Sequence, residues 1–158
     1  MKKILFTTFL FLSSCGFSPL YQSVSTDEGN VPVLVEPIPD QYGFSMQQII
    51  QNKFGNPKDT SYTLTVSAPT FHSWDQTIDD KNFTTIMGIK GTVHYKLTET
   101  KTKKVLLKNT ATLTDSYSVV KAPYATTVAE RKVKQDLSEQ LANQISLHVL
   151  GTLAGVSH

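Results

Sequence analysis

Three stretches between residues 61 and 119 alternate between apolar and polar side chains, which is the pattern of a β-strand with one buried face. Their apolar positions are Tyr62, Leu64, Val66 and Ala68, then Met87, Ile89, Val93, Tyr95 and Leu97, then Val105, Leu107, Ala111, Leu113, Tyr117 and Val119. The intervening positions are mostly threonine, serine and lysine. Breaks near residues 74–82 and 100–103 separate the stretches, so the pattern predicts an antiparallel meander with one apolar and one hydroxyl-rich face.

Two segments carry apolar residues at helical spacing instead. The first covers residues 42–54, and Ser45 is its expected N-cap. The second begins near Pro123, or one turn later if Thr127 and Glu130 form a capping box, and it exceeds 20 residues. The apolar positions are Met46, Ile49, Ile50 and Phe54 in the first helix, and Ala129, Val133, Leu137, Leu141, Ile145 and Val149 in the second.

A short β-branched segment precedes the first helix. It runs from Val31 to Pro37, and its two prolines favour an edge strand because proline cannot donate to the ladder. The order strand, helix, three strands, helix predicts an α+β fold (β-α-β-β-β-α). We expect a two-layer sandwich, with two helices packed on one face of a four-stranded, mainly antiparallel sheet. The second face of the sheet would then stay open.

The amino-terminal residues have the pattern of an export signal. Two lysines at positions 2 and 3 precede an apolar run over residues 4–12, which falls short of the roughly 20 residues that cross a bilayer. Leu12-Ser13-Ser14-Cys15 follows and is similar to a bacterial lipobox, in which the cysteine thiol receives lipid. The alternative is an ordinary signal peptide with a chance cysteine. Gly16 stands where an Asp would favour inner-membrane retention in enterobacteria, which predicts the outer membrane.

This pattern divides the chain into three parts. Residues 1–14 are the expected signal peptide, residues 15–30 the lipidated N-terminus and tether, and residues 31–158 a single α+β domain. Cys15 is the only cysteine among 158 residues. We therefore expect diacylglycerol and an N-acyl chain on Cys15, which anchors the protein on the periplasmic side of the outer membrane, and no other cofactor. Two or three acyl chains make such attachment stable.

Charge is uneven along the chain, although without residues 1–14 it carries 13 basic and 13 acidic side chains. The full sequence has a net charge of +2, which does not suggest a nucleic-acid partner. Residues 16–80 carry two lysines against eight acidic side chains, whereas residues 81–158 carry eleven Lys and Arg against five. This asymmetry marks a partner surface, or the two halves simply pair with each other in the fold.

No catalytic or metal motif is present in the sequence. His72, His94, His148 and His158 lack metal-ligand spacing to another His, Cys, Asp or Glu. The nearest approach to a site is His72 with Asp75, and the pair Asp79-Asp80 reads better as a solvated loop tip. No GxSxG, Gly-rich phosphate loop or HExxH occurs. We expect a binding protein that is not an enzyme and holds no metal.

Lysines on the expected open face are the candidate ligand contacts. Lys90, Lys96, Lys104 and Lys108 fall on the polar side of neighbouring strands, where they could meet anionic glycolipid head groups. The alternative is a solvated sheet face whose threonines satisfy strand propensity. Trp74 falls in the expected connection between the first two strands of the meander. It is either a partner anchor or a residue that packs a loop.

Two short motifs resemble the LPS-assembly lipoprotein LptE in its alphaproteobacterial form. The first is Cys15-Gly16-Phe17-Ser18-Pro19-Leu20-Tyr21, directly after the cleavage site. The second includes Ser116-Tyr117-Ser118-Val119, Pro123-Tyr124-Ala125 and Ala129-Glu130, followed by Leu141-Ala142-Asn143-Gln144-Ile145 in the last helix. The match is close over about thirty residues and loose over the remaining mature chain. The family often carries Arg or Lys at the position of Ser18.

The resemblance implies a fold, a partner and a role. LptE-like proteins have two helices on a four-stranded sheet, sit inside the LptD β-barrel and plug it, and assist the insertion of lipopolysaccharide into the outer leaflet. A hydroxyl-rich surface suits the polar lumen of such a barrel. Partner contacts are then expected at Phe17, Pro19, Leu20, Tyr21 and Trp74. The alternative is a periplasm-facing lipid-binding or adaptor lipoprotein without a barrel partner.

Overall fold

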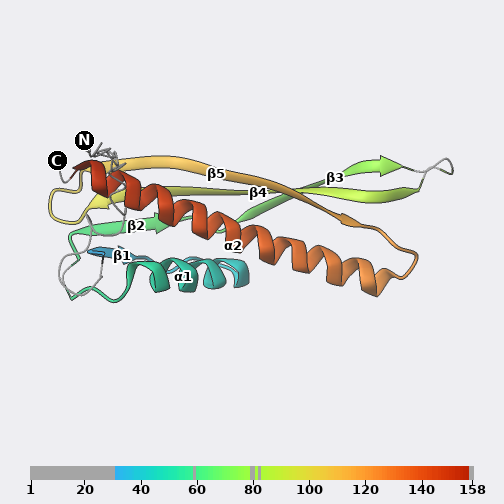
Figure 1. The fold of residues 1–158 in the computed structure, drawn as a ribbon, viewed down its shortest axis with the longest axis horizontal. Coiled ribbons are helices and arrows are strands. Elements are labelled where there is room, and N and C mark those ends of the chain that lie inside the picture. Colours follow the sequence, from blue (N-terminus) through green and yellow to red (C-terminus); the bar gives the residue numbers. More distant parts are fainter. Residues whose placement is uncertain (1–30, 59, 79–80, 82, 157–158) are drawn as a thin grey trace, which may run out of the picture.

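The computed structural model describes residues 31–156 apart from residues 59, 79, 80 and 82. Both helices lie on one side of a single sheet, and α2 runs along almost its whole length (Figure 1). The elements in chain order are β1 (Val33–Val35), α1 (Gln41–Phe54), β2 (Tyr62–Val66), β3 (Thr70–Ile78), β4 (Thr84–Glu99), β5 (Val105–Ser118) and α2 (Pro123–Val156). The predicted α+β sandwich with one open sheet face is confirmed.

Strand β4 is the centre of the sheet. One edge of β4 pairs with β3 and then with β2, while β5 pairs with the other edge over its whole length, all antiparallel. Strand β1 pairs with β2 in parallel and forms the edge strand that the two prolines predicted. Strands β2 and β3 follow one another along the same edge of β4. Pro69 lies between them and has no N–H for the ladder, so the pairing is interrupted there. Five strands thus occupy four positions across the sheet.

The core lies between the sheet and the two helices. The alternating apolar positions of β2 and β4 are buried, as are Met46, Ile50 and Phe54 of α1. Helix α2 contributes Leu137, Leu141, Ile145 and Val149, which confirms most of its predicted apolar seam. A smaller cluster around Ile89, Tyr117 and Leu137 extends the core toward the outer half of the sheet. Neither helix, in the part of the chain described, is long and apolar enough to span a bilayer.

Helix α2 begins at Pro123 as predicted, whereas the N-cap of α1 differs from the expectation. Asp40, not Ser45, caps α1: its carboxylate accepts a hydrogen bond from the Gln41 amide, and its carbonyl accepts one from the Phe44 amide at 2.9 Å. Helix α2 begins at Pro123, so Thr127 forms no capping box and its hydroxyl donates to the Pro123 carbonyl at 3.1 Å. Asp40 has a φ of 77° and a ψ of 158°, a backbone conformation that is strained for a residue with a Cβ.

Strand β3 was not predicted, and the placement of Trp74 in a connection was wrong. Trp74 lies within β3, paired with Gly88 of β4. The alternation failed here because the helices contact only the start of β3, where Phe71 packs against Tyr42 of α1, and only Phe71 and Ser73 of its nine residues are even partly buried. A strand that is exposed on both sides over most of its length has no apolar face to reveal it.

The amino-terminal expectations lie outside the described residues. They are the signal peptide at 1–14, the tether at 15–30 with lipidation at Cys15, and the partner contacts at Phe17, Pro19, Leu20 and Tyr21. Asp79, Asp80 and His158 lie outside them as well.

Candidate functional site: the open face of the sheet

The face of the sheet turned away from the helices carries polar side chains. Because side chains alternate along a strand, every residue paired directly across β3, β4 and β5 shares a face with its partner. The central open-face positions of β4 are Lys90, Thr92, His94 and Lys96, and hydroxyl side chains flank them on β2, β3 and β5. This is the open face that the sequence predicted.

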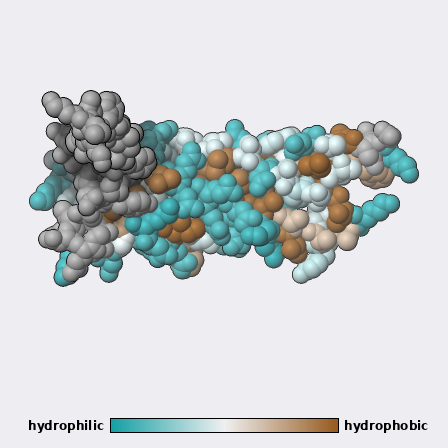
Figure 2. Space-filling model, in the orientation of Figure 1, coloured by the Kyte–Doolittle hydropathy of each residue, from teal (hydrophilic) through white to brown (hydrophobic). Residues whose placement is uncertain are grey.

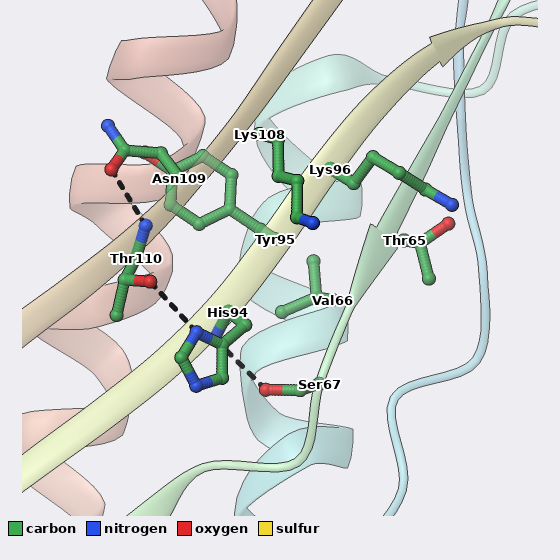
Figure 3. Close-up of a pocket in the computed structure, with 9 residues that line it drawn as sticks. All are labelled: Thr65, Val66, Ser67, His94, Tyr95, Lys96, Lys108, Asn109 and Thr110. Atoms are coloured by element: carbon green, nitrogen blue, oxygen red, sulfur yellow. Dashed lines mark hydrogen bonds between the residues drawn. The ribbon is translucent and has the colours of Figure 1, made fainter. Parts of the chain in front are cut away.

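A hollow of about 560 Å³ lies on this face, between β2, β4 and β5 (Figure 3). We call it the basic hollow. Its open-face side chains are two lysines, one histidine, two threonines and one serine, whereas the register places Tyr95 and its partner Asn109 on the opposite face. The lining residues are Thr65, Val66, Ser67, His94, Tyr95, Lys96, Lys108, Asn109 and Thr110. No carboxylate lines it, so the fixed charge in the basic hollow is positive.

His94 is held in place by both neighbouring strands. Its Nδ1 lies 2.8 Å from the Thr110 hydroxyl of β5, and its backbone N–H donates to Oγ of Ser67 at 3.0 Å. The Ser67 amide in turn donates to the His94 carbonyl at 2.8 Å. These bonds join β4 to β5 and to the residue that follows β2. Among the described residues nothing bonds to the second imidazole nitrogen of His94, which is therefore available for a ligand at the hollow.

Two lysines stand opposite each other at the basic hollow. Lys96 of β4 and Lys108 of β5 are direct register partners. Like charges directly opposite one another destabilise a strand pair. Figure 3 shows the Lys96 side chain extending toward Thr65 of β2, with its amino group pointing away from that of Lys108. Two ammonium groups without a carboxylate among them, beside hydroxyl and imidazole groups, are suited to bind phosphate or another anion.

The four lysines expected to cluster do not share one site. Lys90 lies six residues before Lys96 on the same strand, a separation of roughly 20 Å at 3.3 Å per residue. Lys104 lies in the turn between β4 and β5, where its carbonyl accepts a hydrogen bond from the Glu99 amide. Only Lys96 and Lys108 are direct register partners. The sequence alone could not show which lysines are partners, because that depends on the register between β4 and β5.

Trp74 lies on the open face in direct contact with β4. A Cβ built on Gly88 would stand 2.3 Å from Cε2 and 2.4 Å from Cζ2 of the indole, so the ring covers the backbone of this glycine. The side chain is nevertheless 38% exposed. Trp74 therefore packs on the sheet with one side and faces solvent with the other, and it is not a buried loop-packing residue.

A second hollow lies at the end of the sheet remote from β1, and we call it the distal hollow. It measures about 780 Å³ and is lined by Lys81, Phe83, Thr84, Thr85, Val119, Val120 and Lys121. Phe83 is 67% exposed and Tyr124, the second residue of α2, is 83% exposed. Figure 2 shows hydrophobic residues at the surface at this end of the molecule. No sequence pattern indicated the distal hollow, because its lining brings together residues 81 and 83–85 with residues 119–121, which lie far apart in the chain.

The remaining candidate pairs do not form a reactive site. His72 pairs with Lys90 and Asp75 with Met87, so their side chains leave opposite faces of β3. Asp75 accepts a hydrogen bond from the Thr84 hydroxyl at 2.9 Å. Within the described ranges, no three His, Cys, Asp or Glu side chains gather closely enough to hold a metal ion.

The chain has the fold of several solved bacterial lipoproteins. Rare lipoprotein B from Shewanella oneidensis matches with a TM-score of 0.67 at 10% identity, over 80% of this chain and 98% of that chain. A candidate lipoprotein from Caulobacter crescentus matches with a TM-score of 0.61 at 14% identity, over 86% and 96%. Uncharacterized lipoprotein B from Nitrosomonas europaea matches with a TM-score of 0.55 at 14% identity, over 77% and 87%.

These identities are low, and the three matches establish a shared fold. No family model matches the sequence, and no curated protein matches it. The matches cover 77–86% of this chain and 87–98% of the other chains, so the shared fold takes in most of each protein.

Proposed function

We propose that this protein is an outer-membrane lipoprotein of the LptE type, which binds and plugs an LptD-type β-barrel and assists lipopolysaccharide insertion into the outer leaflet. The observation that carries the proposal is the uncovered sheet face with its basic hollow. The helices leave one whole face of the sheet uncovered, and this face carries hydroxyl groups and lysines. Such a face is suited to contact with a polar surface. The motifs around Cys15 and Pro123 and the shared lipoprotein fold support it.

A polar barrel lumen fits such a face physically. The interior of an outer-membrane barrel is wet and polar. A plug in that lumen gains from many hydrogen bonds spread over its surface, and the open face supplies exposed hydroxyl groups along β5, at Thr110, Thr112, Thr114, Ser116 and Ser118. Lipid on Cys15 would confine the protein to the membrane plane and raise its effective concentration near the barrel.

Co-purification tests the partner. The tagged full-length lipoprotein is captured from detergent-solubilised envelopes, and we expect a large β-barrel protein to follow in a fixed ratio. Cys15→Ala is the matched variant: it should leave a folded protein in the soluble periplasmic fraction and lower the recovery of the barrel. Mass spectrometry of the native N-terminal peptide should find acyl chains on Cys15. An unmodified Cys15 would refute the membrane anchor and the role that depends on it.

Neutralising the basic hollow tests lipopolysaccharide binding. Lys96→Gln with Lys108→Gln removes both facing charges, and we expect lipopolysaccharide to bind at least about tenfold more weakly, a change worth 1.4 kcal/mol. Lys101→Gln with Lys103→Gln removes the same charge from the turn between β4 and β5 and should change affinity far less. Equal affinities for the two double variants would show that Lys96 and Lys108 do not bind lipopolysaccharide. The fold of each is checked by circular dichroism.

The distal hollow favours a second candidate function, a periplasm-facing lipid-binding lipoprotein without a barrel. Its lining combines Phe83, Val119 and Val120 with Lys81 and Lys121, a combination that suits a lipid with an anionic head group and apolar chains. This candidate predicts that the captured protein carries lipid and that no barrel follows it. Recovery of a barrel whose yield falls when the open face is altered would favour the first function instead.

A further inference from the structure

A flat aromatic platform lies on the open face, separate from the basic hollow. Three rows of residues cross β3, β4 and β5 in register: Thr70–Thr92–Thr112, His72–Lys90–Thr114 and Trp74–Gly88–Ser116. All nine positions point to the open face, because residues two apart on a strand share a side. With strands about 4.8 Å apart and 3.3 Å per residue, the platform covers roughly 10 by 13 Å.

The indole of Trp74 provides an apolar plane within this polar area. Its contact with the Gly88 backbone, at 2.3–2.8 Å from a Cβ built there, lays the ring against the sheet. Any side chain larger than hydrogen at position 88 would lift the ring away. The outward side of the ring is exposed, and its Nε1–H donates to no group among the described residues. A ring held flat with one face in solvent is available for stacking.

Hydrogen-bonding groups surround the ring and are not used by the fold. The side chains of His72, Lys90 and Thr114 form no hydrogen bond or ion pair within the described part of the chain. They form the row next to Trp74, and Ser116 lies in the same row as the ring. None of the nine platform positions carries a carboxylate, and Lys90 carries a positive charge. The platform therefore offers an apolar plane, several hydrogen-bond donors and acceptors, and one cation.

We propose that this platform binds an acidic saccharide, with a sugar ring stacked on Trp74. A pyranose presents C–H groups on a face and hydroxyl groups around its edge. The negative face of an aromatic ring attracts the C–H groups, and imidazole and threonine hydroxyl groups bond to the rim. Lys90 pairs with a phosphate or carboxylate on the sugar. The saccharide part of lipopolysaccharide is the source that the proposed function supplies, and the inference rests on that function for this identity alone.

The experiment uses the one tryptophan of the chain as its reporter. The full-length protein in mild detergent is titrated with water-soluble lipopolysaccharide oligosaccharide from which all acyl chains have been removed, and its fluorescence is recorded. We expect a saturable shift of the emission to shorter wavelength. Trp74→Leu, measured by calorimetry, should raise Kd at least tenfold, and Trp74→Phe should recover part of the affinity. Tyr124→Leu removes an exposed aromatic ring from α2 and should leave Kd unchanged.

The charge of the saccharide is tested with a second ligand. The same oligosaccharide with its phosphates removed should bind several-fold more weakly to the native protein. Lys90→Gln should weaken binding of the phosphorylated form and leave the dephosphorylated form unaffected. An unshifted emission at saturating oligosaccharide, or a native Kd in a folded Trp74→Leu variant, would overturn the proposal.

Failure here and failure of the barrel role give different results. If the oligosaccharide binds and no barrel co-purifies, saccharide binding by the platform is supported and the proposed role as a barrel plug is contradicted. If a barrel co-purifies and Trp74 emission responds to the barrel and not to the oligosaccharide, the platform is a protein contact and this inference is wrong.

Discussion

The hydroxyl of Tyr95 lies 2.5 Å from Nδ1 of His148, and this contact joins the central strand to helix α2. The rings meet edge to face at a centroid distance of 6.0 Å. Tyr95 is 4% exposed, so its hydroxyl depends on this partner. Because a hydrogen bond contributes about 1 kcal/mol net, Tyr95→Phe should lower the free energy of unfolding by about that amount.

A double-mutant cycle isolates the Tyr95–His148 contact from burial of the ring. His148→Ala and Tyr95→Phe are combined, and urea unfolding gives the four free energies. We expect the double variant to cost less than the two single changes together, because both remove the same bond. Additive costs would show that the two side chains act independently.

Gly88→Ala should displace the indole of Trp74 and destabilise the sheet. The added Cβ would overlap the ring at 2.3 Å, and overpacking of this kind typically costs about 1–3 kcal/mol. The ring can swing outward because it is partly exposed, so we expect the low end of this range together with a red shift of the tryptophan emission. In the Trp74→Ala background the same change should cost almost nothing. A Gly88→Ala cost that persists without the indole would place the strain in the backbone.

The sequence predicted the elements whose faces differ in polarity and missed the one whose faces do not. Strands β2, β4 and β5 and both helices bury one side, so their apolar residues recur with the right period. Strand β3 is exposed on both sides from Trp74 onward and shows no apolar alternation there. The sequence pattern therefore predicted a connection at Trp74 where the structure has a strand. The caps also differed: Ser45 has the preferred side chain for an N-cap, yet Asp40 stands where the chain turns.

The candidate site could be predicted by face but not by position. Alternation placed Lys90, Lys96 and Lys108 on the polar side of their strands, as the structure has them. Which lysine stands opposite which depends on the length of the turn at residues 100–104 and on the bulge between Leu97 and Thr98, and a shift of one residue changes every pair. For the same reason no sequence pattern joins Trp74 to Gly88. These pairings arise only from the register.

Truncation of the α2 seam should distinguish the buried side of the helix from its exposed side. Leu141 is fully buried between the helices and the sheet, whereas Leu147 on the same helix is 49% exposed. Leu141→Ala should cost about 2–5 kcal/mol because it removes apolar contacts and leaves a cavity. Leu147→Ala should change the free energy of unfolding by less than about 0.5 kcal/mol. Urea unfolding followed by circular dichroism measures both, and similar costs would contradict the placement of α2.

Lys108→Glu should stabilise the free protein while it weakens anion binding. The substitution replaces a like-charge pair with Lys96 by an opposite-charge pair, a change worth up to about 1 kcal/mol in a sheet. The gain should shrink in high salt because exposed charges are screened. Lys90→Glu makes the same charge change on the same face, opposite Thr114, and should not stabilise. A destabilising Lys108→Glu would mean that the two ammonium groups do not interact in the folded chain.

Stability should fall at alkaline pH in a way that depends on Tyr117. Burial and the nearby Glu130 carboxylate raise the pKa of Tyr117 above its ordinary value of 10.0, while Lys134 acts in the opposite direction. An unfolded chain loses the phenol proton near its ordinary pKa, whereas the folded chain still holds it. The contribution of this group is therefore complete below about pH 10 and is lost as the pH rises through the folded pKa.

Tyr117→Phe removes the titrating group and keeps the ring. We expect the native protein to lose stability as the pH rises above about 10, where the unfolded chain releases the phenol proton first, and the variant to lose less. Urea midpoints at pH 8, 10 and 11 give the comparison. Tyr124→Phe is the control because Tyr124 is 83% exposed, and its profile should follow that of the native protein. Parallel profiles for the native protein and Tyr117→Phe would show that ionisation of Tyr117 does not drive the alkaline loss, since only its hydroxyl separates the two chains.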